Sequence, residues 1–277
     1  MGTVYDLHCH SNASDGILRP DELVSRAKTQ QVDVLALTDH DTLQGYALAR
    51  QLGDELGVRL ICGIELSSQW AKQGIHIVGL NLNPTAPALV EAVKLQQQER
   101  RTRADEIAAR LEKQGFSGAL DGARRFAGDA SLGRPHFARF LVEQGHVDSM
   151  NTAFKRYLGA GKIGDVKHGW PDFERVIGWI KAAGGVAVLA HPVKYKLTRS
   201  KLHSLVGDFC EAGGEAIEVI SGQQTAQVTD TIARVATRFG LLASCGSDFH
   251  APNQPWQELG AFGKLPPVCH PVWCAWD

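Results

Sequence analysis

Histidine and carboxylate residues recur at short, regular spacings near the ends of apolar segments. His8 and His10 form an H-x-H pair, and a spacing of two places both side chains on one side of an extended strand. Asp248 and His250 repeat this spacing near the other end of the chain. Imidazoles and carboxylates in such a mixture suit divalent cations such as Mn²⁺, Fe²⁺ or Zn²⁺. Other residues of these types that end or follow a predicted strand are Asp15, His40, Glu65 and His191.

The number of these candidates exceeds what one metal ion needs. Two ions would normally share such a set and three fit as well, with Glu65 as a natural bridging carboxylate. Clusters of this kind activate water at neutral pH and neutralise charge on a phosphoryl group. Any one histidine taken alone is more often a core or surface residue, and Asp39 and Asp41 fit helix caps as well as ligands. The repeated placement at strand ends is what indicates a metal site.

Short apolar runs alternate with helical patterns at both ends of the chain, and this rhythm predicts parallel strands joined by crossover helices. The carboxyl ends of parallel barrel strands form one rim, so the candidate ligands should converge there. His76 lies at the start of its strand and fits only if that strand runs against the others. The predicted strands are 4–8, 32–38, 58–65, 76–80, 186–190, 215–220 and 241–244. The predicted flanking helices are 20–30, 42–56, 172–183, 201–212 and 225–239.

The rhythm stops between residues 84 and 164, where helices at 87–114, 135–144 and 149–158 are predicted. We therefore expect an α/β fold, a distorted seven-stranded (β/α) barrel formed by residues 1–81 and 167–277, with a helical insert at 82–166. Residues 94–139 carry ten Lys or Arg against six Asp or Glu. This basic excess suits an anionic substrate, or else reflects solvated helix faces.

Composition limits the remaining classes of protein. The 277 residues are 44% hydrophobic and 21% charged, with a net charge of −1, as in ordinary globular domains. Six scattered cysteines without a C-x-x-C pair indicate reduced thiols, so we expect a cytoplasmic protein. The sequence has no apolar run long enough for a membrane span and no secretory signal pattern. No membrane association and no obligate protein partner are expected.

A set of motifs in fixed order resembles one known family. DLHCHS, Asp15, LTDHD, GIELS, HIVGL, LAHP and GSDFH follow one another between residues 6 and 250, as in the polymerase-and-histidinol-phosphatase (PHP) family. The resemblance implies a distorted seven-stranded barrel holding three divalent metal ions for phosphoester hydrolysis, with manganese expected and iron or zinc as alternatives. It also implies that His76, whose position in its strand left its role open, is one of the metal ligands. The implied ligands are His8, His10, Asp15, His40, Glu65, His76, His191, Asp248 and His250, and all but His76 are also candidate catalytic residues.

The insert and the GRPHFARFLVEQG stretch resemble the bacterial members that act on nucleotides. The resemblance implies a 3′,5′-nucleoside bisphosphate phosphatase, converting pAp to AMP, with 5′→3′ exonuclease activity on short 5′-phosphorylated RNA. The alternatives are a histidinol-phosphate or sugar-phosphate phosphatase and a non-catalytic metal-binding PHP module. A second phosphate needs basic residues on the insert. We expect substrate contacts from Arg134, His136 and Lys162, and place Arg100, Arg101 and Arg103 on a solvated helix face.

Overall fold

Seven strands form one sheet whose spatial order follows the sequence. The computed structural model describes residues 2–166 and 169–276. Neighbouring strands are parallel except where β4 pairs, antiparallel, with β3 and β5. The sheet is nearly closed, because a parallel bridge joins Cys9 to Phe249 beyond the end of β7. The strands are β1 (Tyr5–Cys9), β2 (Val34–Leu37), β3 (Arg59–Trp70), β4 (Gln73–Leu80), β5 (Val186–Leu189), β6 (Ala216–Ser221) and β7 (Leu242–Gly246). This arrangement confirms the predicted distorted barrel.

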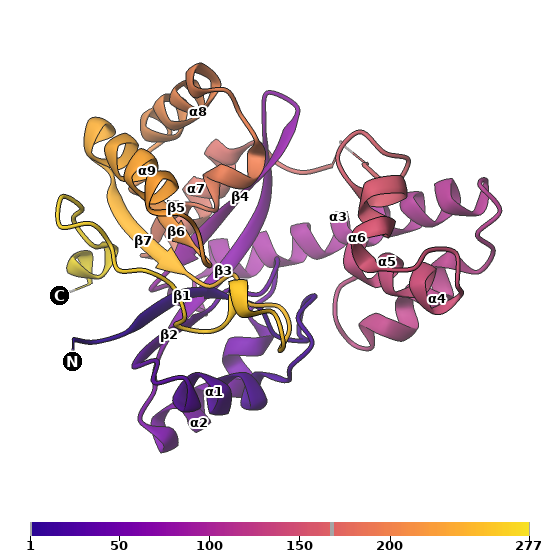
Figure 1. The fold of residues 1–277 in the computed structure, drawn as a ribbon, viewed down its shortest axis with the longest axis horizontal. Coiled ribbons are helices and arrows are strands. Elements are labelled where there is room, and N and C mark those ends of the chain that lie inside the picture. The colour runs from indigo at the N-terminus through magenta and orange to yellow at the C-terminus, as the bar shows by residue number, and fades with distance from the viewer. Residues whose placement is uncertain (1, 167–168, 277) are drawn as a thin grey trace.

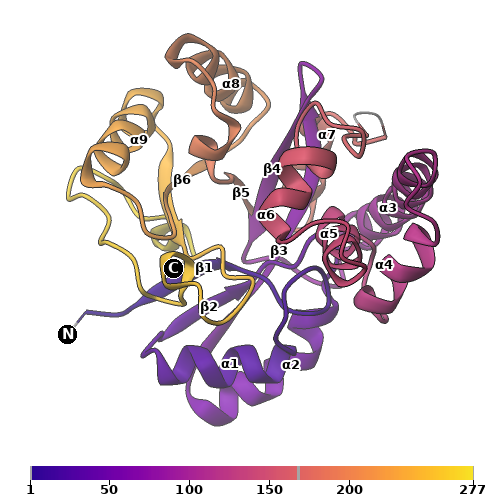
Figure 2. The same ribbon diagram turned by 45° about the vertical axis from the view of Figure 1, so that its right-hand side comes forward.

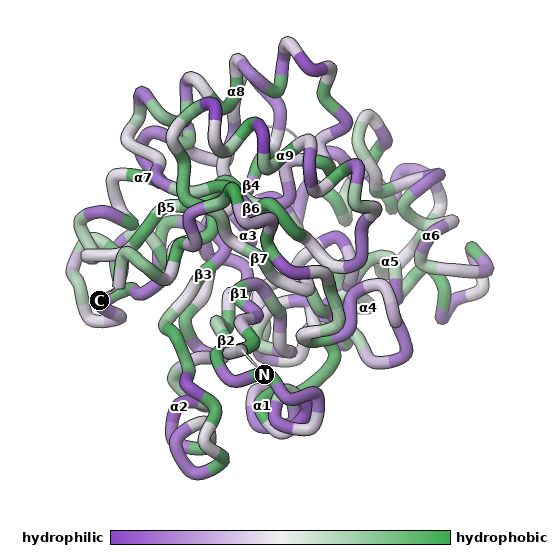
Figure 3. The backbone as a smooth tube through the Cα atoms, turned by 60° about the vertical axis from the view of Figure 1, so that its left-hand side comes forward, coloured by the Kyte–Doolittle hydropathy of each residue, from purple (hydrophilic) through white to green (hydrophobic). Residues whose placement is uncertain are grey.

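Helices cover the outside of the barrel, as Figure 2 shows, and all of those named below except α7 connect parallel strands. Their apolar faces pack on strands whose residues are mostly buried, and Figure 3 shows hydrophobic residues gathered along the central strands. These helices are α1 (Pro20–Thr29), α2 (Gln44–Leu56), α7 (Phe173–Ala182), α8 (Arg199–Glu211) and α9 (Ala226–Phe239). Short 3₁₀ turns at Pro192–Tyr195, Pro255–Gln257 and Val272–Ala275 complete this part. No helix among the described residues has the length and apolar character needed to cross a bilayer.

The insert extends from one side of the barrel (Figure 1). It consists of α3 (Pro87–Glu112), α4 (Ala119–Ala127), α5 (Arg134–Glu143) and α6 (Met150–Ala153), followed by a π-helical turn at Phe154–Leu158. Helix α3 belongs to two hydrophobic clusters. Leu89 packs in the cluster of the barrel, whereas Ile107 and Leu111 pack in a separate cluster with α4 and α5. The division at residues 82–166 stays a prediction, and its second boundary adjoins residues 167–168, which lie outside the described part.

The structure corrects three predicted elements. Strand β3 continues to Trp70 and pairs with β4 as a hairpin whose turn residues, Ala71 and Lys72, have positive φ angles of 48° and 66°. Neither residue signals such a turn, so strands 58–65 and 76–80 were predicted too short. The helix expected at 149–158 is a short α-helix followed by the π-helical turn. Helix α4 was not predicted, and its Gly122 packs so closely on α5 that a Cβ atom there would lie 2.1 Å from Phe140.

Candidate metal centre

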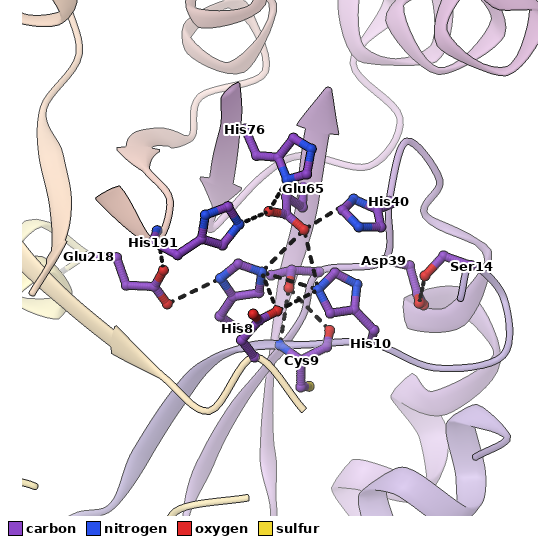
Figure 4. A network of polar contacts seen from close by, with 12 residues as sticks. His8, Cys9, His10, Ser14, Asp39, His40, Glu65, His76, His191 and Glu218 are labelled. Carbon is purple, nitrogen blue, oxygen red and sulfur yellow. Dashed lines mark hydrogen bonds and ion pairs between the residues drawn. The ribbon is translucent and has the colours of Figure 1, made fainter. Parts of the chain in front are cut away.

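Glu65, on β3, lies at the centre of the converging imidazoles (Figure 4). The side chain is fully buried. One oxygen, Oε1, lies 2.8 Å from Nδ1 of His76 and 2.8 Å from Nε2 of His191. The other, Oε2, lies 3.1 or 3.2 Å from a nitrogen of three further imidazoles, those of His8, His10 and His40. One carboxylate thus faces five histidines, which is the arrangement that a bridging ligand needs.

Asp15 forms a second centre at the edge of this cluster. Its Oδ1 lies 3.4 Å from Nε2 of His250 and 3.9 Å from Nδ1 of His10. Its Oδ2 lies 3.7 Å from Nε2 of His40. Because His10 and His40 also face Glu65, the two centres share histidines and form one continuous set of donors.

Asp248 closes the cluster from the loop after β7. Its Oδ1 lies 3.3 Å from Nε2 of His10 and 3.6 Å from Nε2 of His8, and its Oδ2 contacts the ammonium group of Lys194. Asp248 and His191 have positive φ angles of 54° and 28°. Such backbone conformations are costly for residues with a Cβ, and they concentrate where function dictates side-chain direction.

The donor set fits divalent cations in its geometry. Four overlapping groups each hold donor atoms within 4.8 Å of one another. Nδ1 of His40 and Oε2 of Glu65 are buried 3.1 Å apart, yet within the described chain neither makes a hydrogen bond. Buried polar atoms are rarely left unsatisfied, so these two atoms fit a role as metal ligands. The groups are His10–Asp15–His40–His250, His8–Glu65–His191, His8–His10–Asp248 and His40–Glu65–His76.

Most protonation states in the cluster also suit metal binding, which requires charged carboxylates and neutral imidazoles. Burial alone would raise the pKa of Glu65, but the surrounding histidines outweigh it and hold that pKa well below its usual range. Burial lowers the pKa of His191 to about 4 and lowers that of His250. His8 is the exception: burial disfavours its charge, but Glu218 and Glu65 raise its pKa to about 10.

His76 reaches the cluster because β4 runs against its neighbours. The start of an antiparallel strand lies at the same rim as the ends of the parallel strands, and His76 pairs with Ser67 in the β3–β4 ladder. The expectation that this strand runs antiparallel is confirmed. All nine predicted ligands therefore lie together, and that they bind metal remains our proposal.

Glu218, on β6, is a residue of the site that the sequence did not reveal. It is buried, its Oε1 lies 3.1 Å from Nδ1 of His8, and its Oε2 accepts the backbone N–H of His191 at 2.6 Å. A carboxylate behind a ligating histidine fixes the ring and leaves its other nitrogen, here Nε2, facing the metal. The sequence did carry one signal, an acidic residue in the apolar strand AIEVIS.

We expect Glu218→Gln to lower the affinity for Mn²⁺ by about 10- to 100-fold, because His8 loses the carboxylate that orients it. Isothermal titration of metal-stripped protein measures this change. Glu215→Gln is the matched control, since Glu215 is exposed just before the same strand. Equal metal affinity of both variants and the parent chain would show that Glu218 does not support the metal site.

Asp39 and Asp41 are neither ligands nor helix caps. Asp39 accepts hydrogen bonds from the backbone and hydroxyl of Ser11 and from the hydroxyl of Ser14, and so holds the loop that carries Asp15. Asp41, with a positive φ of 55°, accepts from Ser67 and from the guanidinium of Arg100 at 2.6 Å. Helix α2 has no side-chain cap, so the capping interpretation was wrong.

A pocket of about 140 Å³ adjoins the cluster and is lined by three arginines of the insert. Arg134, one of the predicted substrate contacts, lines this pocket, and its Nη1 donates to the carbonyl of Leu158. Arg100 and Arg103 were predicted to be solvated, but they are only 9% and 8% exposed. Arg103 lies over the ring of Trp170, with its guanidinium carbon 4.4 Å from the ring centroid.

Three guanidinium groups near one pocket favour an anionic ligand. Burial, with Arg134 and Arg100 nearby, lowers the pKa of Arg103 to about 10. The pocket meets the metal cluster directly, because Asp15, His40 and His76 line both.

The other two predicted substrate contacts lie outside this pocket. His136 is buried, and its Nδ1 accepts the backbone N–H of Gly133 at 3.0 Å at the start of α5. Burial lowers the pKa of this histidine to about 4. Lys162 is exposed in a turn and does not line the pocket. Their roles as substrate contacts stay predictions: the ring of His136 is engaged at the helix start and lines a neighbouring hollow, and the side chain of Lys162 is turned to solvent.

Comparison with known proteins places the fold and the motifs in one family. A family model described as the PHP domain matches residues 6–183. A 3′,5′-nucleoside bisphosphate phosphatase of Chromobacterium violaceum is 43% identical over 97% of this chain and 94% of its own length. A 5′-3′ exoribonuclease of Haemophilus influenzae is 46% identical over 99% of both chains.

Two solved structures have the same fold as this chain. An amidohydrolase from Chromobacterium violaceum, with bound sulfate and no metal, superposes with a TM-score of 0.93 at 42% identity, covering 99% of this chain and 95% of that one. A candidate metal-dependent phosphoesterase from Bifidobacterium adolescentis gives a TM-score of 0.80 at 25% identity, over 98% of this chain and 94% of that one. The matched model, the relatives and the histidine-rich rim of a seven-stranded barrel lead to the same conclusion: the chain belongs to the PHP domain family.

Proposed function

We propose that the chain is a metal-dependent phosphohydrolase that removes the 3′-phosphate from nucleoside 3′,5′-bisphosphates, pAp to AMP, and also degrades short 5′-phosphorylated RNA from its 5′ end. One observation carries the proposal: the arginine-lined pocket opens directly onto the candidate metal cluster. A substrate with two phosphates can place one over the metals and the other among the arginines. The names of the two relatives, a bisphosphate phosphatase and an exoribonuclease, support the same substrate class.

The nine clustered ligands would hold three divalent cations, with manganese as the proposed metal and iron or zinc as alternatives. Divalent cations, when bound, activate water and neutralise charge on phosphoryl oxygens. Glu65 keeps five imidazoles in place around itself, and Glu218 orients His8. Hydrolysis forms a bond from water oxygen to phosphorus and breaks the bond to the 3′ oxygen, which must gain a proton. The proton that the attacking water gives up balances this step, while His250 and His191, whose pKa values burial lowers, would serve as neutral ligands of the cations.

The insert would bind the other phosphate, chiefly through Arg134. Arg100 is fixed by Asp41, so its remaining guanidinium nitrogens are held in one orientation beside the pocket. Preorganised donors bind an anion at a lower entropic cost than mobile ones. The proposal includes a cytoplasmic location, supported by six cysteines that form no disulfide. The proposed partners are the nucleotide or a short oligoribonucleotide, with no membrane and no obligate protein partner.

The test is phosphate release from 3′,5′-bisphosphoadenosine by Mn²⁺-loaded protein, with adenosine 5′-monophosphate and histidinol phosphate in parallel. We expect fast release with the 5′-monophosphate as product and slow turnover of the other two. Faster turnover of histidinol phosphate would assign the chain to the histidinol-phosphate or sugar-phosphate phosphatases. No hydrolysis of any phosphoester by metal-loaded protein would favour the non-catalytic module.

Removal of metal is a separate prediction. Dialysis against a chelator should abolish phosphate release, because the buried carboxylates and imidazoles alone offer no electrophile for the phosphoryl oxygens. Activity should return on titration with Mn²⁺, and the amount of Mn²⁺ needed per chain for full recovery reports the number of functional ions. Undiminished activity in chelator, with metal absent by elemental analysis, would contradict the proposed mechanism.

A further inference from the structure

A groove runs between the insert and the barrel and shares Leu132 with the arginine-lined pocket. It consists of two adjoining hollows of about 450 and 440 Å³. Both hollows are lined by Ala13 and Gln44 of the barrel and by the segment 127–130 of the insert. The proposed hydrolysis of a nucleotide does not use this groove.

The charge of the groove is basic. Four arginines line it, against a single acidic residue, Asp129. Two of them form surface ion pairs outside the lining, Arg124 with Asp121 and Asp105, and Arg125 with Glu143. Exposed pairs of this kind are weak, so a phosphate group can compete for these guanidinium groups. The remaining two arginines are Arg101, which is exposed, and Arg139.

Apolar side chains lie among these charges. Ile17 and Leu48 are 52% and 63% exposed, and both line the first hollow together with Phe126. Large hydrophobic residues this exposed are few among the described residues, and two of them share this groove. A surface that combines guanidinium groups with exposed apolar and aromatic side chains matches single-stranded nucleic acid, which presents phosphates and unstacked bases.

Backbone contacts place the groove next to the candidate metal centre. Arg139 donates from Nη2 to the backbone carbonyl of Asp15 at 3.1 Å. The backbone N–H of Ile17 donates to the carbonyl of His250 at 2.8 Å. Asp15 and His250 face each other in the cluster, so a chain that leaves the metals on this side meets Ile17 and Arg139 first.

We propose that this groove binds the RNA strand on the 3′ side of the phosphate that is hydrolysed. The proposal rests on the proposed exonuclease activity and adds the path of its substrate. The 5′-phosphate lies among Arg100 and Arg134, the next phosphate lies over the metals, and the following nucleotides enter the groove. There the arginines contact the backbone, and Leu48, Ile17 and Phe126 pack against bases.

The test uses two surface variants, Arg101→Glu and Leu48→Asp, neither of which belongs to the catalytic or 5′-phosphate machinery. Each has a matched control away from the groove. Arg59→Glu reverses an exposed charge at the start of β3, and Val268→Asp replaces an apolar residue that is 55% exposed. The kcat/KM values for pAp and for a 5′-phosphorylated eight-nucleotide RNA are compared. Binding of the same RNA, labelled at its 3′ end, is measured by fluorescence anisotropy in chelator, where hydrolysis is stopped.

We expect each groove variant to lower kcat/KM for the RNA by about 10-fold while pAp changes less than about 2-fold, and the controls to leave both substrates unchanged. Anisotropy with Arg101→Glu should show weaker binding and a salt dependence shallower by about 0.7 in log–log slope, as expected for one lost phosphate contact. Equal losses on both substrates, or equal effects of variants and controls, would overturn the proposal. So would a changed oligomeric mass with unchanged RNA kinetics, which would mark the groove as a protein interface. The proposed function fails separately, if the parent chain hydrolyses neither substrate, and the binding measurement remains informative in that case.

Discussion

Glu65→Gln should reduce phosphate release from pAp by at least about 1,000-fold and lower the metal content of the purified protein. The substitution keeps the shape of the side chain but removes the negative charge that faces five imidazoles, and an amide offers only one weakly coordinating oxygen. Loss of the bridging carboxylate therefore disturbs more than one metal position at once. Initial rates with saturating Mn²⁺, together with elemental analysis, measure both effects.

The control for this prediction is Glu91→Gln, on the exposed face of α3, which should retain full activity and metal. Thermal unfolding of both variants separates a loss of function from a loss of fold. A Glu65→Gln protein that binds its full complement of metal and hydrolyses pAp at the parent rate would remove Glu65 from the proposed centre.

Arg134→Ala should raise the KM for pAp by about 10- to 100-fold and leave the kinetics of a simple phosphate monoester nearly unchanged. A charge-assisted hydrogen bond contributes about 1.5–3 kcal/mol to binding. Only the bisphosphate has a second phosphate that makes this bond, so only its binding is weakened by the substitution. Arg134 is the best arginine for this test, because its protein partners are a carbonyl and a carboxylate about 4.0 Å away. Replacing Arg100 would instead leave the buried Asp41 without its cation and would confuse binding with stability.

Arg234→Ala, an exposed arginine on α9, is the matched control and should leave the KM for both substrates unchanged. Equal effects of Arg134→Ala on the bisphosphate and on the simple monoester would show that this arginine does not bind the second phosphate. A change in kcat alone would place Arg134 in the chemical step instead.

The strand-end ligands were predictable because their positions follow from backbone geometry. A spacing of two fixes the side of a strand on which His8 and His10 lie, and parallel strands bring their ends to one rim. The position of His76 required the direction of β4, which depends on a hairpin whose turn residues, Ala71 and Lys72, are uncharacteristic of such turns.

The supporting residues were not predictable for a different reason. Arg100 reads as one of several charges along a helix, and its burial depends on Asp41, which comes from a loop 59 residues earlier. Glu218 is tolerated inside the barrel because His8, from the first strand, and the backbone N–H of His191 reach it. In both cases the partner that offsets the cost of burying a charge lies far away in the sequence. The local sequence shows one charged residue but not the partner that allows it to be buried.

Helix α3 restricts how the length of this chain can change. The same helix carries Gln96, which bonds to Asp41, then Arg100 and Arg103 at the pocket, and finally Ile107 in the core of the insert. Each added residue turns an α-helix by about 100° and lengthens it by about 1.5 Å. A single insertion between Gln96 and Arg100 would therefore rotate Arg100 and Arg103 away from the pocket. It would also change the position of the whole insert relative to the barrel. Changes in length are tolerable after Glu112, where the helix ends. Within α3, by contrast, the number of residues determines the distance between the metals and the site of the second phosphate.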